Sequence, residues 1–300
     1  CVWGDFDLTK IRLFSFDTVI EELRYIFKKS EHQFNLTVAD ANFGILKRDL
    51  ELTKKLANNK KKYGYPNQFR VCFTKNSTEQ VFNLAKIFTD AGMDKGVSVS
   101  MQSMDPETLK NIKRDNIKTS FFKELQKKYV KADLVTYTEL ILPLPGETVQ
   151  SFSEGIDNLL DSSQHSGIIV YNSSVMPNAE LGNLEYQQKH GIKTIRIPIF
   201  QAHSNFKKNF EDNIREFEEI VVETNTMKIN DWKRTFKYSI IVQSFHVLGL
   251  LQAIGIILRY NFGIKYSELF NSILNFGLNN KDTVIGRELS NLDDLLNNVL

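Results

Sequence analysis

The sequence is poor in cysteine, proline and tryptophan, and its charges nearly cancel. Its 300 residues include two cysteines (Cys1 and Cys72), six prolines and two tryptophans. Two cysteines are too few for a disulfide scaffold, and this usage is typical of a reducing compartment, so we expect a cytoplasmic protein. With 38 basic and 36 acidic residues the net charge is +2, so no global field indicates binding to nucleic acid or to an anionic membrane.

The sequence also has no recognisable signal segment, because no basic start precedes an apolar run. The one apolar run of bilayer length is 240–258, and it holds polar side chains at Gln243, Ser244, His246 and Gln252. These polar groups favour a buried helix of a helical domain over a membrane span. Because the chain begins with Cys1 in place of methionine, we expect it to be a piece of a longer protein.

Strand and helix patterns alternate over the first 200 residues. Apolar spacing predicts helices over 18–29, 47–59, 78–91 and 149–162, and a broken helical region after Asp105. Strands are predicted over 34–39, 69–73, 97–101, 134–142 and 167–171, with 192–200 as a candidate last strand. Alternating units of this kind without hairpin signals predict a parallel sheet, which is either closed as a (β/α) barrel or open and doubly wound.

After residue 200 the alternation stops. The later segments are predicted to be helices over 206–222, 232–258, 266–277 and 287–300. We therefore expect an α/β domain over 1–200 and a small helical C-terminal domain over 201–300.

The most informative stretch is 134–148, which is predicted to be one strand and the start of a helix. Pro143 and Pro145 end the strand because proline cannot donate to a sheet ladder, and Gly146 permits a tight turn. Glu147 follows, and Thr148 is a suitable N-cap for the next helix. In α/β proteins this junction of strand end and helix start is where ligands bind.

Several of these strand-end segments, in this order, resemble the radical S-adenosylmethionine (SAM) superfamily. The segments are Asp40-Ala-Asn-Phe, Val97-Ser-Val-Ser-Met-Gln-Ser, Leu109-Lys-Asn-Ile-Lys-Arg, Glu139-Leu-Ile-Leu-Pro-Leu-Pro-Gly-Glu-Thr and 171–177. Within the superfamily, the sequence is most similar to the class that usually carries an N-terminal cobalamin-binding domain. The resemblance covers about residues 1–200 and the segment 218–232. It implies a partial (β/α) TIM-like barrel with parallel strands, whose first strand is missing.

The resemblance also implies a metal site at the start of the chain. The superfamily binds a 4Fe-4S cluster through three cysteines that follow the first barrel strand. Cys1 stands where the third of these ligands is expected, so it is the candidate metal ligand. Cys72 alternates with Val71 and Phe73 in an apolar strand, which predicts a buried packing thiol. We therefore expect this piece alone to assemble no cluster.

For S-adenosylmethionine, the resemblance implies a set of cofactor-binding residues. Ser98, Ser100 or Gln102, together with Glu139, would face the ribose and amino groups, and Arg114 would pair with the carboxylate. The adenine would be walled, partly through backbone groups, by Pro143 to Glu147, which include Pro145 and Gly146, and by Val175 to Pro177. Asp40 and Asn42 would orient the substrate or the cluster loop.

Each of these roles has a structural alternative. Arg114 could pair with Glu107 or Asp115 on a solvated helix. Glu147 could serve only the dipole of its own helix. Tyr171 could be a core residue, and Asp40 and Asn42 could merely cap the following helix.

The implied activity is reductive cleavage of S-adenosylmethionine by the cluster, which yields a 5′-deoxyadenosyl radical. With cobalamin, methyl transfer to a small-molecule substrate becomes possible, and a reductant such as flavodoxin or ferredoxin is the expected partner. One alternative is a barrel enzyme that binds a phosphorylated metabolite at the helix start Gly146-Glu-Thr, although the acidic Glu147 argues against it. The other is a non-catalytic barrel with a helical interaction module. Two further cysteines upstream would favour the radical enzyme.

Overall fold

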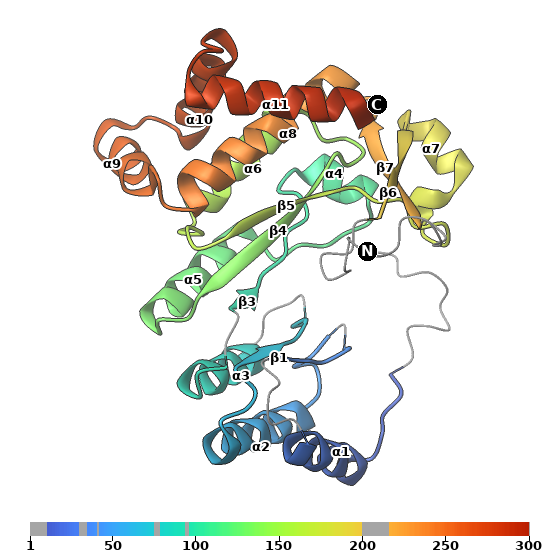
Figure 1. The fold of residues 1–300 in the computed structure, drawn as a ribbon, viewed down its shortest axis with the longest axis vertical. Helices are drawn as coiled ribbons and strands as arrows, with labels where there is room; N and C mark the ends of the chain where they lie inside the picture. The colour runs from blue at the N-terminus through green and yellow to red at the C-terminus, as the bar shows by residue number, and fades with distance from the viewer. Residues whose placement is uncertain are drawn as a thin grey trace.

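The computed structural model describes residues 11–29, 35–40, 42–74, 79–93, 96–199 and 216–299. Over these ranges the chain is a mixed α/β protein with parallel strands and many helices (Figure 1). The predicted α/β class is thus confirmed. Cys1 lies outside the described residues.

The first strands form a two-stranded parallel sheet, β1-β2, in which Leu36 pairs with Phe69. An isolated parallel bridge between Phe43 and Phe73 continues the pair beyond its ends. Phe43, Phe69 and Phe88 form a buried aromatic cluster between this sheet and the helices, with the Phe69 and Phe88 ring centroids 4.7 Å apart. The elements of this part are α1 (Phe16–Lys29), β1 (Asn35–Thr37), α2 (Arg48–Tyr63), β2 (Gln68–Arg70) and α3 (Glu79–Asp90).

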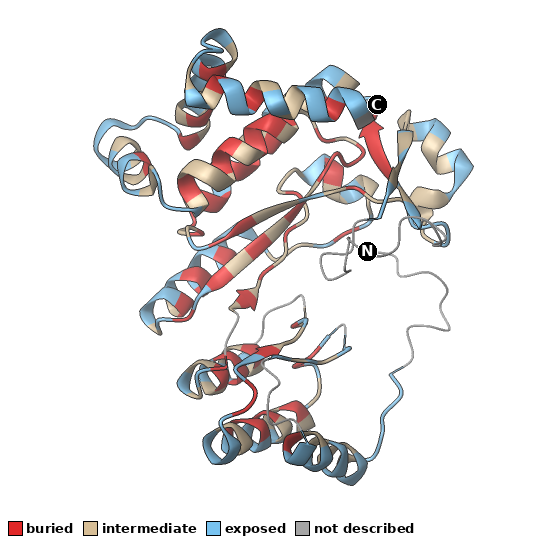
Figure 2. Ribbon diagram, viewed as in Figure 1, coloured by how far each residue is buried: buried red, intermediate tan, exposed pale blue. Residues whose placement is uncertain are grey.

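The central sheet has the parallel order β3-β4-β5, and β4 is its middle strand. Along β4 buried and half-buried residues alternate strictly, which Figure 2 shows as alternating red and tan. Because successive side chains of a strand point to opposite faces, Tyr137, Glu139 and Ile141 share one face and the buried residues pack on the other. The elements of this part are β3 (Val97–Ser98), α4 (Pro106–Asn111), α5 (Thr119–Lys131), β4 (Thr136–Leu142), α6 (Val149–Leu160) and β5 (Ile168–Asn172).

The predicted helix starts in this part are confirmed. Thr148 caps α6 in a capping box, because its hydroxyl accepts from the Ser151 amide while the Ser151 hydroxyl accepts from the Thr148 amide, both at 2.9 Å. Asp105 caps α4 by accepting from the Thr108 amide at 2.7 Å, and Pro106 takes the first helical position.

One predicted helix is wrong where the structure describes it. Residues 217–222 of the expected helix 206–222 belong to the strand β7 (Phe217–Glu223), which pairs antiparallel with β6 (Lys193–Pro198). Ser174, just after β5, bridges to Ile220 of β7. The run Ile220–Val222 is buried there, and its β-branched side chains suit a strand. The β6–β7 pair crosses the expected boundary at residue 200, and the division into two domains stays a prediction.

The predicted helix 232–258 is also wrong in its length. It consists of α8 (Ile229–Val242), the π-helical turn η3 (Gln243–Val247) and α9 (Gln252–Phe262), and the chain turns between η3 and α9 at Gly249, whose φ is +84°. Within the described ranges no individual helix has the length and apolarity to cross a membrane. By length and composition alone, Ile229–Val247 and Gln252–Phe262 do so only as a pair, and they are bent by 93°.

The helices α8 and α10 pack on α6, and the last helix packs on α8 and α10, in the upper part of Figure 1. Asp157 of α6 accepts from the amide and the hydroxyl of Ser267, at 2.8 and 2.5 Å, and so supports the first turn of α10. Arg259 of α9 binds both oxygens of Asp161, at 2.8 and 2.6 Å. The last helices are α10 (Tyr266–Asn279) and α11 (Val284–Val299).

Candidate functional site

A polar cluster lies on the half-buried face of the central sheet, where three predicted residues come together. The Ser100 hydroxyl donates to Oε2 of Glu139. The Ser98 hydroxyl lies 3.3 Å from the same oxygen and 2.7 Å from the Ser100 hydroxyl. The strands bring them together because Ser98 and Ser100 point to the same face as Glu139 on the neighbouring strand. Among the described residues both serines use Oε2, so Oε1 is the oxygen available to a ligand.

Arg114 lies beside this cluster and is buried, with 8% of its surface exposed. Its Nη2 donates to the Ser100 carbonyl, and its Nε donates to Asn116 Oδ1 at 2.7 Å. Nη1 is buried and has no partner among the described residues. Burial lowers the pKa of Arg114, and the nearby Glu139 carboxylate opposes this shift. The alternative that Arg114 is a solvated side chain is therefore wrong. Because a buried N–H of a cation is costly without a hydrogen-bond partner, we expect an acceptor to bind at Nη1.

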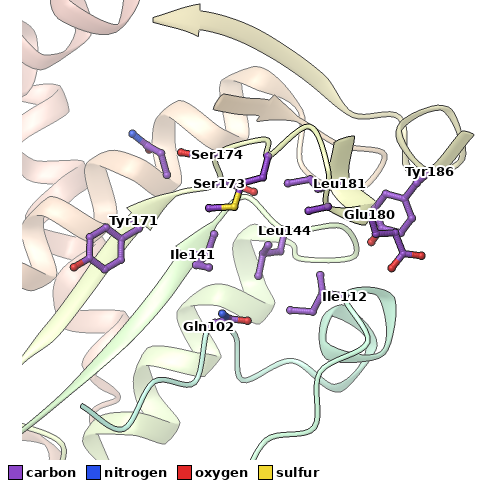
Figure 3. Close-up of a pocket in the computed structure, with 13 residues that line it drawn as sticks. Gln102, Ile112, Ile141, Leu144, Tyr171, Ser173, Ser174, Glu180, Leu181 and Tyr186 are labelled. Atoms are coloured by element: carbon purple, nitrogen blue, oxygen red, sulfur yellow. The ribbon is translucent and has the colours of Figure 1, made fainter. Parts of the chain in front are cut away.

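Next to the cluster is a cavity of about 380 Å³ at the carboxyl ends of β4 and β5 (Figure 3). Gln102 lies at its base, Tyr171 and Ile141 line the strand side, and Leu144 lines the turn after β4. Its lining is mainly apolar, with a few polar groups, as is typical of small-molecule sites. The other lining residues are Ile112, Asn172, Ser173, Ser174, Met176, Ala179, Glu180, Leu181 and Tyr186.

The far side of the cavity is closed by a segment that the sequence did not indicate, comprising η2 (Glu180–Gly182) and α7 (Leu184–His190). The Tyr186 hydroxyl donates to the Asn111 carbonyl at 2.9 Å, and Lys113 forms an ion pair with Glu180 at 2.6 Å. Burial, reinforced by Glu180, raises the pKa of Tyr186 to about 12, so its hydroxyl remains a donor at neutral pH. The available signal was Asn183, a good N-cap, with Gly191 beyond the helix end.

The turn after β4 does not face the cavity as predicted, apart from Leu144. Gly146 has a φ of +99°, and a Cβ there would lie 2.6 Å from Asn111 Nδ2, which itself donates to the Pro145 carbonyl at 3.1 Å. Glu147 is buried and accepts from the hydroxyls of Ser103 and Ser151, at 2.5 and 2.7 Å. Burial raises the pKa of Glu147 to about 6. These bonds agree with the alternative in which Glu147 serves the start of α6.

Two curated proteins match this sequence over most of its length. One is the cobalamin-dependent radical SAM methyltransferase TokK of Streptomyces tokunonensis, 34% identical over 286 residues, which are 95% of this chain and 41% of that protein. The other is 2-(S-pantetheinyl)-carbapenam-3-carboxylate methyltransferase of Streptantibioticus cattleyicolor, also 34% identical, over 95% of this chain and 41% of that protein. Over 95% of its own length the chain is thus similar to two methyltransferases, one of which is named a radical SAM enzyme. It spans about 41% of the length of these relatives.

Family models and solved structures give no further information on the family. No family model matches the sequence. A structure of the radical SAM methyltransferase TsrM from Kitasatospora setae, with cobalamin and a 4Fe-4S cluster bound, has a TM-score of 0.45 to this fold. It is 15% identical, over 60% of this chain and 34% of that one.

Three other residues suggested by the radical SAM resemblance, Asp40, Asn42 and Pro177, are not among the residues that line the cavity. Asp40 and Asn42 are exposed, and Oδ1 of Asp40 accepts from the Asn42 amide at 2.8 Å. Neither caps α2, since Asp49 instead accepts from two amides before that helix. Pro177 is exposed and follows the cavity residue Met176. Tyr171 is 49% exposed, so the alternative that places it in the core is wrong.

The radical SAM metal site is not formed by the described residues. They contain no group of three histidine, cysteine or acidic side chains that could hold a metal ion. The prediction that Cys72 is a buried packing thiol is wrong, because Cys72 is exposed. Its neighbour Phe73 points into the aromatic cluster, so Cys72 points to the opposite face.

Proposed function

We propose that this chain is the radical SAM part of a cobalamin-dependent methyltransferase. The observation that carries the proposal is the match of 95% of the chain to two methyltransferases at 34% identity. Because the chain spans 41% of their length, the activity of the whole protein belongs to the proposal. The polar cluster and the cavity give it a physical basis.

The residues of the site suit S-adenosylmethionine. Its carboxylate needs a cation, and Arg114 is a buried cation whose Nη1 has no partner within the described ranges. Its ammonium and ribose hydroxyls need acceptors, and Oε1 of Glu139 is available. The adenosyl group needs an apolar slot that excludes water, which the 380 Å³ cavity provides. When bound, S-adenosylmethionine supplies a methyl group and a cleavable carbon–sulfur bond.

Within this proposal, the chain's own residues bind and orient the cofactor. Glu139 is held in place by Ser98 and Ser100, so its carboxylate is oriented before a ligand arrives. Arg114 is held by the carbonyl of Ser100, which belongs to the polar cluster, and by the side chain of Asn116, which lies on the same loop as Arg114. Ser100 thus connects Arg114, which would bind the carboxylate of S-adenosylmethionine, with Glu139, which would bind its ammonium group. Gln102, at the base of the cavity, would contact the adenosyl group.

The described residues do not fit a 4Fe-4S cluster. The 300-residue sequence has two cysteines, and such a cluster in this superfamily uses three. Cys1 remains the proposed ligand from this chain. The cluster and cobalamin are proposed for the whole protein on the name of its relative TokK, a cobalamin-dependent radical SAM methyltransferase.

We also propose that the sheets β1-β2 and β3-β4-β5 are parts of a partial (β/α) barrel over residues 1–200, followed by a helical domain over 201–300. The parallel pairing within each sheet and the helices between the strands support this. A small-molecule substrate, a reductant such as flavodoxin or ferredoxin, and a cytoplasmic location are parts of the same proposal.

The phosphate-binding alternative is disfavoured by the start of α6. The Ser151 amide in its first turn already donates to the Thr148 hydroxyl of the capping box. The carboxylate of Glu147 is buried in the same place, where a phosphate would have to lie. An anion is repelled by a carboxylate at this helix start.

The binding of S-adenosylmethionine to this chain tests the proposal, and saturation-transfer NMR can measure the Kd. Arg114→Gln and Glu139→Gln should each raise the Kd at least about tenfold, because each removes a charged hydrogen-bonding partner. Lys118→Gln, an exposed position on the same loop, is the control and should leave the Kd unchanged. If S-adenosylmethionine binds equally well to all four proteins, the site assignment is wrong.

The methyltransferase part of the proposal needs the longer protein. Extended to the length of its relatives and reconstituted anaerobically with iron and sulfide, it should turn brown and transfer a methyl group from S-adenosylmethionine. Arg114→Gln in that protein should reduce turnover while the visible absorbance stays. A reconstituted protein that consumes no S-adenosylmethionine would refute the activity.

A further inference from the structure

The segment that closes the cavity of about 380 Å³, η2 and α7, contacts the end of α4, a few residues before Arg114. The Tyr186 hydroxyl donates to the Asn111 carbonyl at 2.9 Å, and Glu180 forms an ion pair with Lys113 at 2.6 Å. Figure 3 shows Tyr186 and Glu180 together at this end of the cavity. The closing segment therefore contacts the part of the chain that leads to the buried cation of the site.

Arg114 belongs to the cap that ends α4, which has the hydrogen bonds of a Schellman motif. The Arg114 amide donates to the Leu109 carbonyl at 2.9 Å, and the Lys113 amide donates to the Lys110 carbonyl at 3.1 Å. Lys113 has a φ of +50°, in the left-handed region that glycine favours at this position of the motif. A side chain there costs conformational free energy, so the cap needs support from other parts of the fold.

The closing segment supports this cap at two points. The Asn111 carbonyl is one of the last four of α4, which have no partner within the helix, and the Tyr186 hydroxyl is its donor. The ion pair with Glu180 holds the side chain of Lys113. Both members of this ion pair are partly exposed, and such a pair contributes little to stability. The main support therefore comes from Tyr186.

The guanidinium of Arg114 is fixed to a different segment from its backbone. Its Nη2 donates to the Ser100 carbonyl, and its Nε donates to Asn116 Oδ1 at 2.7 Å. The Asn116 amide group in turn donates to the carbonyls of Met101 and Ser103, at 2.8 and 2.9 Å. The acceptors of Arg114 are thus fixed to the segment after β3, whereas its backbone is fixed by the cap of α4. A movement of the cap changes the geometry of the guanidinium, on which bonds to a carboxylate depend.

The closing segment itself has little buried surface. None of the residues of η2 or α7 is buried. The far end of α7 is tied to the loop after β7, where the Asn225 amide donates to the His190 carbonyl at 2.8 Å. Segments with few buried contacts open at a low cost in free energy. The bond from Tyr186 to Asn111 therefore links such a segment to the cap that carries Arg114.

We propose that Tyr186 is a positioning residue for the cofactor carboxylate, and that it acts on Arg114 through the cap of α4. Recognition of the carboxylate then depends on closure of the cavity by α7, so the two ends of S-adenosylmethionine are bound together. The inference rests on the proposed function, in which Arg114 binds this carboxylate. It goes beyond that function because it assigns a role to a segment on the opposite side of the cavity.

The test compares S-adenosylmethionine with its decarboxylated form, which lacks only the carboxylate. Saturation-transfer NMR on the full chain gives both Kd values, and we take their ratio, decarboxylated over intact. This ratio measures the contribution of the carboxylate and cancels changes in the adenosyl slot. Tyr186→Phe removes the hydroxyl and keeps the ring, and it should lower the ratio at least about threefold. If both Kd values rise equally, Tyr186 only shapes the cavity and the proposal is overturned.

Two variants serve as controls. Gln188→Ala removes most of an exposed side chain on α7 and should leave the ratio unchanged. An equal fall of the ratio in Gln188→Ala would overturn the proposal. Tyr186→Phe combined with Arg114→Gln should change the ratio no further than Arg114→Gln alone, because the positioned group is already absent. A further threefold fall in the double variant would contradict the role through Arg114.

A measurement without cofactor separates this inference from the proposed function. NMR follows the exchange of the Arg114 Nε–H with solvent, and Arg114→Lys assigns the resonance. This exchange should be at least about threefold faster in Tyr186→Phe than in the parent, and unchanged in Gln188→Ala. A parent that binds no S-adenosylmethionine would refute the proposed function, and the exchange rate would still decide whether Tyr186 positions Arg114. Equal exchange in the parent and in Tyr186→Phe would overturn the inference.

Discussion

His246 provides the sharpest test of how the C-terminal helices are held. It is fully buried in η3, and its Nε2 lies 3.0 Å from Nδ1 of His165, which precedes β5. Its Nδ1 is buried and has no partner among the described residues. The rings of Tyr266 and Phe270 surround it, with centroids 5.5 and 5.9 Å away. Burial, reinforced by His165, lowers the pKa of His246 from 6.5 to about 4.

The sign of the pH dependence follows from this shift. The unfolded chain binds a proton at His246 with a pKa near 6.5, and the folded chain does so only near 4. Between these values the unfolded state holds more protons, so acidification destabilises the fold. From pH 7 to pH 5 this residue alone should reduce the free energy of unfolding by about 2 kcal/mol. Below pH 4 its contribution becomes constant.

The variant His246→Phe removes the titrating group and keeps an aromatic ring in the pocket. It should cost about 1 to 3 kcal/mol at pH 7, because His165 loses its partner. The pH-dependent loss between pH 7 and pH 5 should shrink by about 2 kcal/mol relative to the parent. Urea unfolding followed by circular dichroism at both pH values measures this, and His190→Gln, a half-buried histidine elsewhere, is the control.

The titration can also be observed directly. The Hε1 resonance of His246 should keep the chemical shift of a neutral imidazole down to about pH 5. A midpoint near 6.5, or a His246→Phe variant that loses as much stability on acidification as the parent, would refute the reasoning.

Three further predictions concern other buried groups. The pKa of Glu147 is raised to about 6, so the fold loses up to about 2 kcal/mol as pH rises from well below 4.5 to well above 6, and urea titrations of Glu147→Gln should lack this loss. Gly146→Ala should lower the free energy of unfolding by about 2 kcal/mol or more, because φ is +99° and the new Cβ would meet Asn111; an unchanged Tm would contradict this. Asp157→Ala should cost about 1 to 3 kcal/mol, because Ser267 loses both bonds, whereas the exposed Asn158→Ala should cost little.

Much of the local structure could be predicted from the sequence because it depends on neighbouring residues. The helices near 18–29 and 47–59 follow from apolar spacing, and the structure has them as α1 and α2. The caps at Thr148 and Asp105 use side chains three residues or fewer from their partners. The proximity of the two serines to Glu139 follows from the period of two in parallel strands.

The wrong predictions have a common cause, because each of these features depends on a neighbour in space that is distant in sequence. The segment 217–223 has an apolar run that suits helix or strand, and it becomes β7 because β6 is there to pair with it. Cys72 was expected to be buried because its neighbours are apolar, but in a strand the neighbours point the other way. The exposure of Tyr171 depends on the cavity beside it.

By itself, the sequence determined the alternation of helices and parallel strands, the caps, and the set of polar residues at the strand ends, because each depends on propensity, periodicity or a short-range bond. Only the tertiary structure decided that Arg114 is buried with one nitrogen that has no partner among the described residues, and that α7 closes the cavity. These features arise from contacts between segments far apart in the chain. The packing that creates them depends on the whole fold.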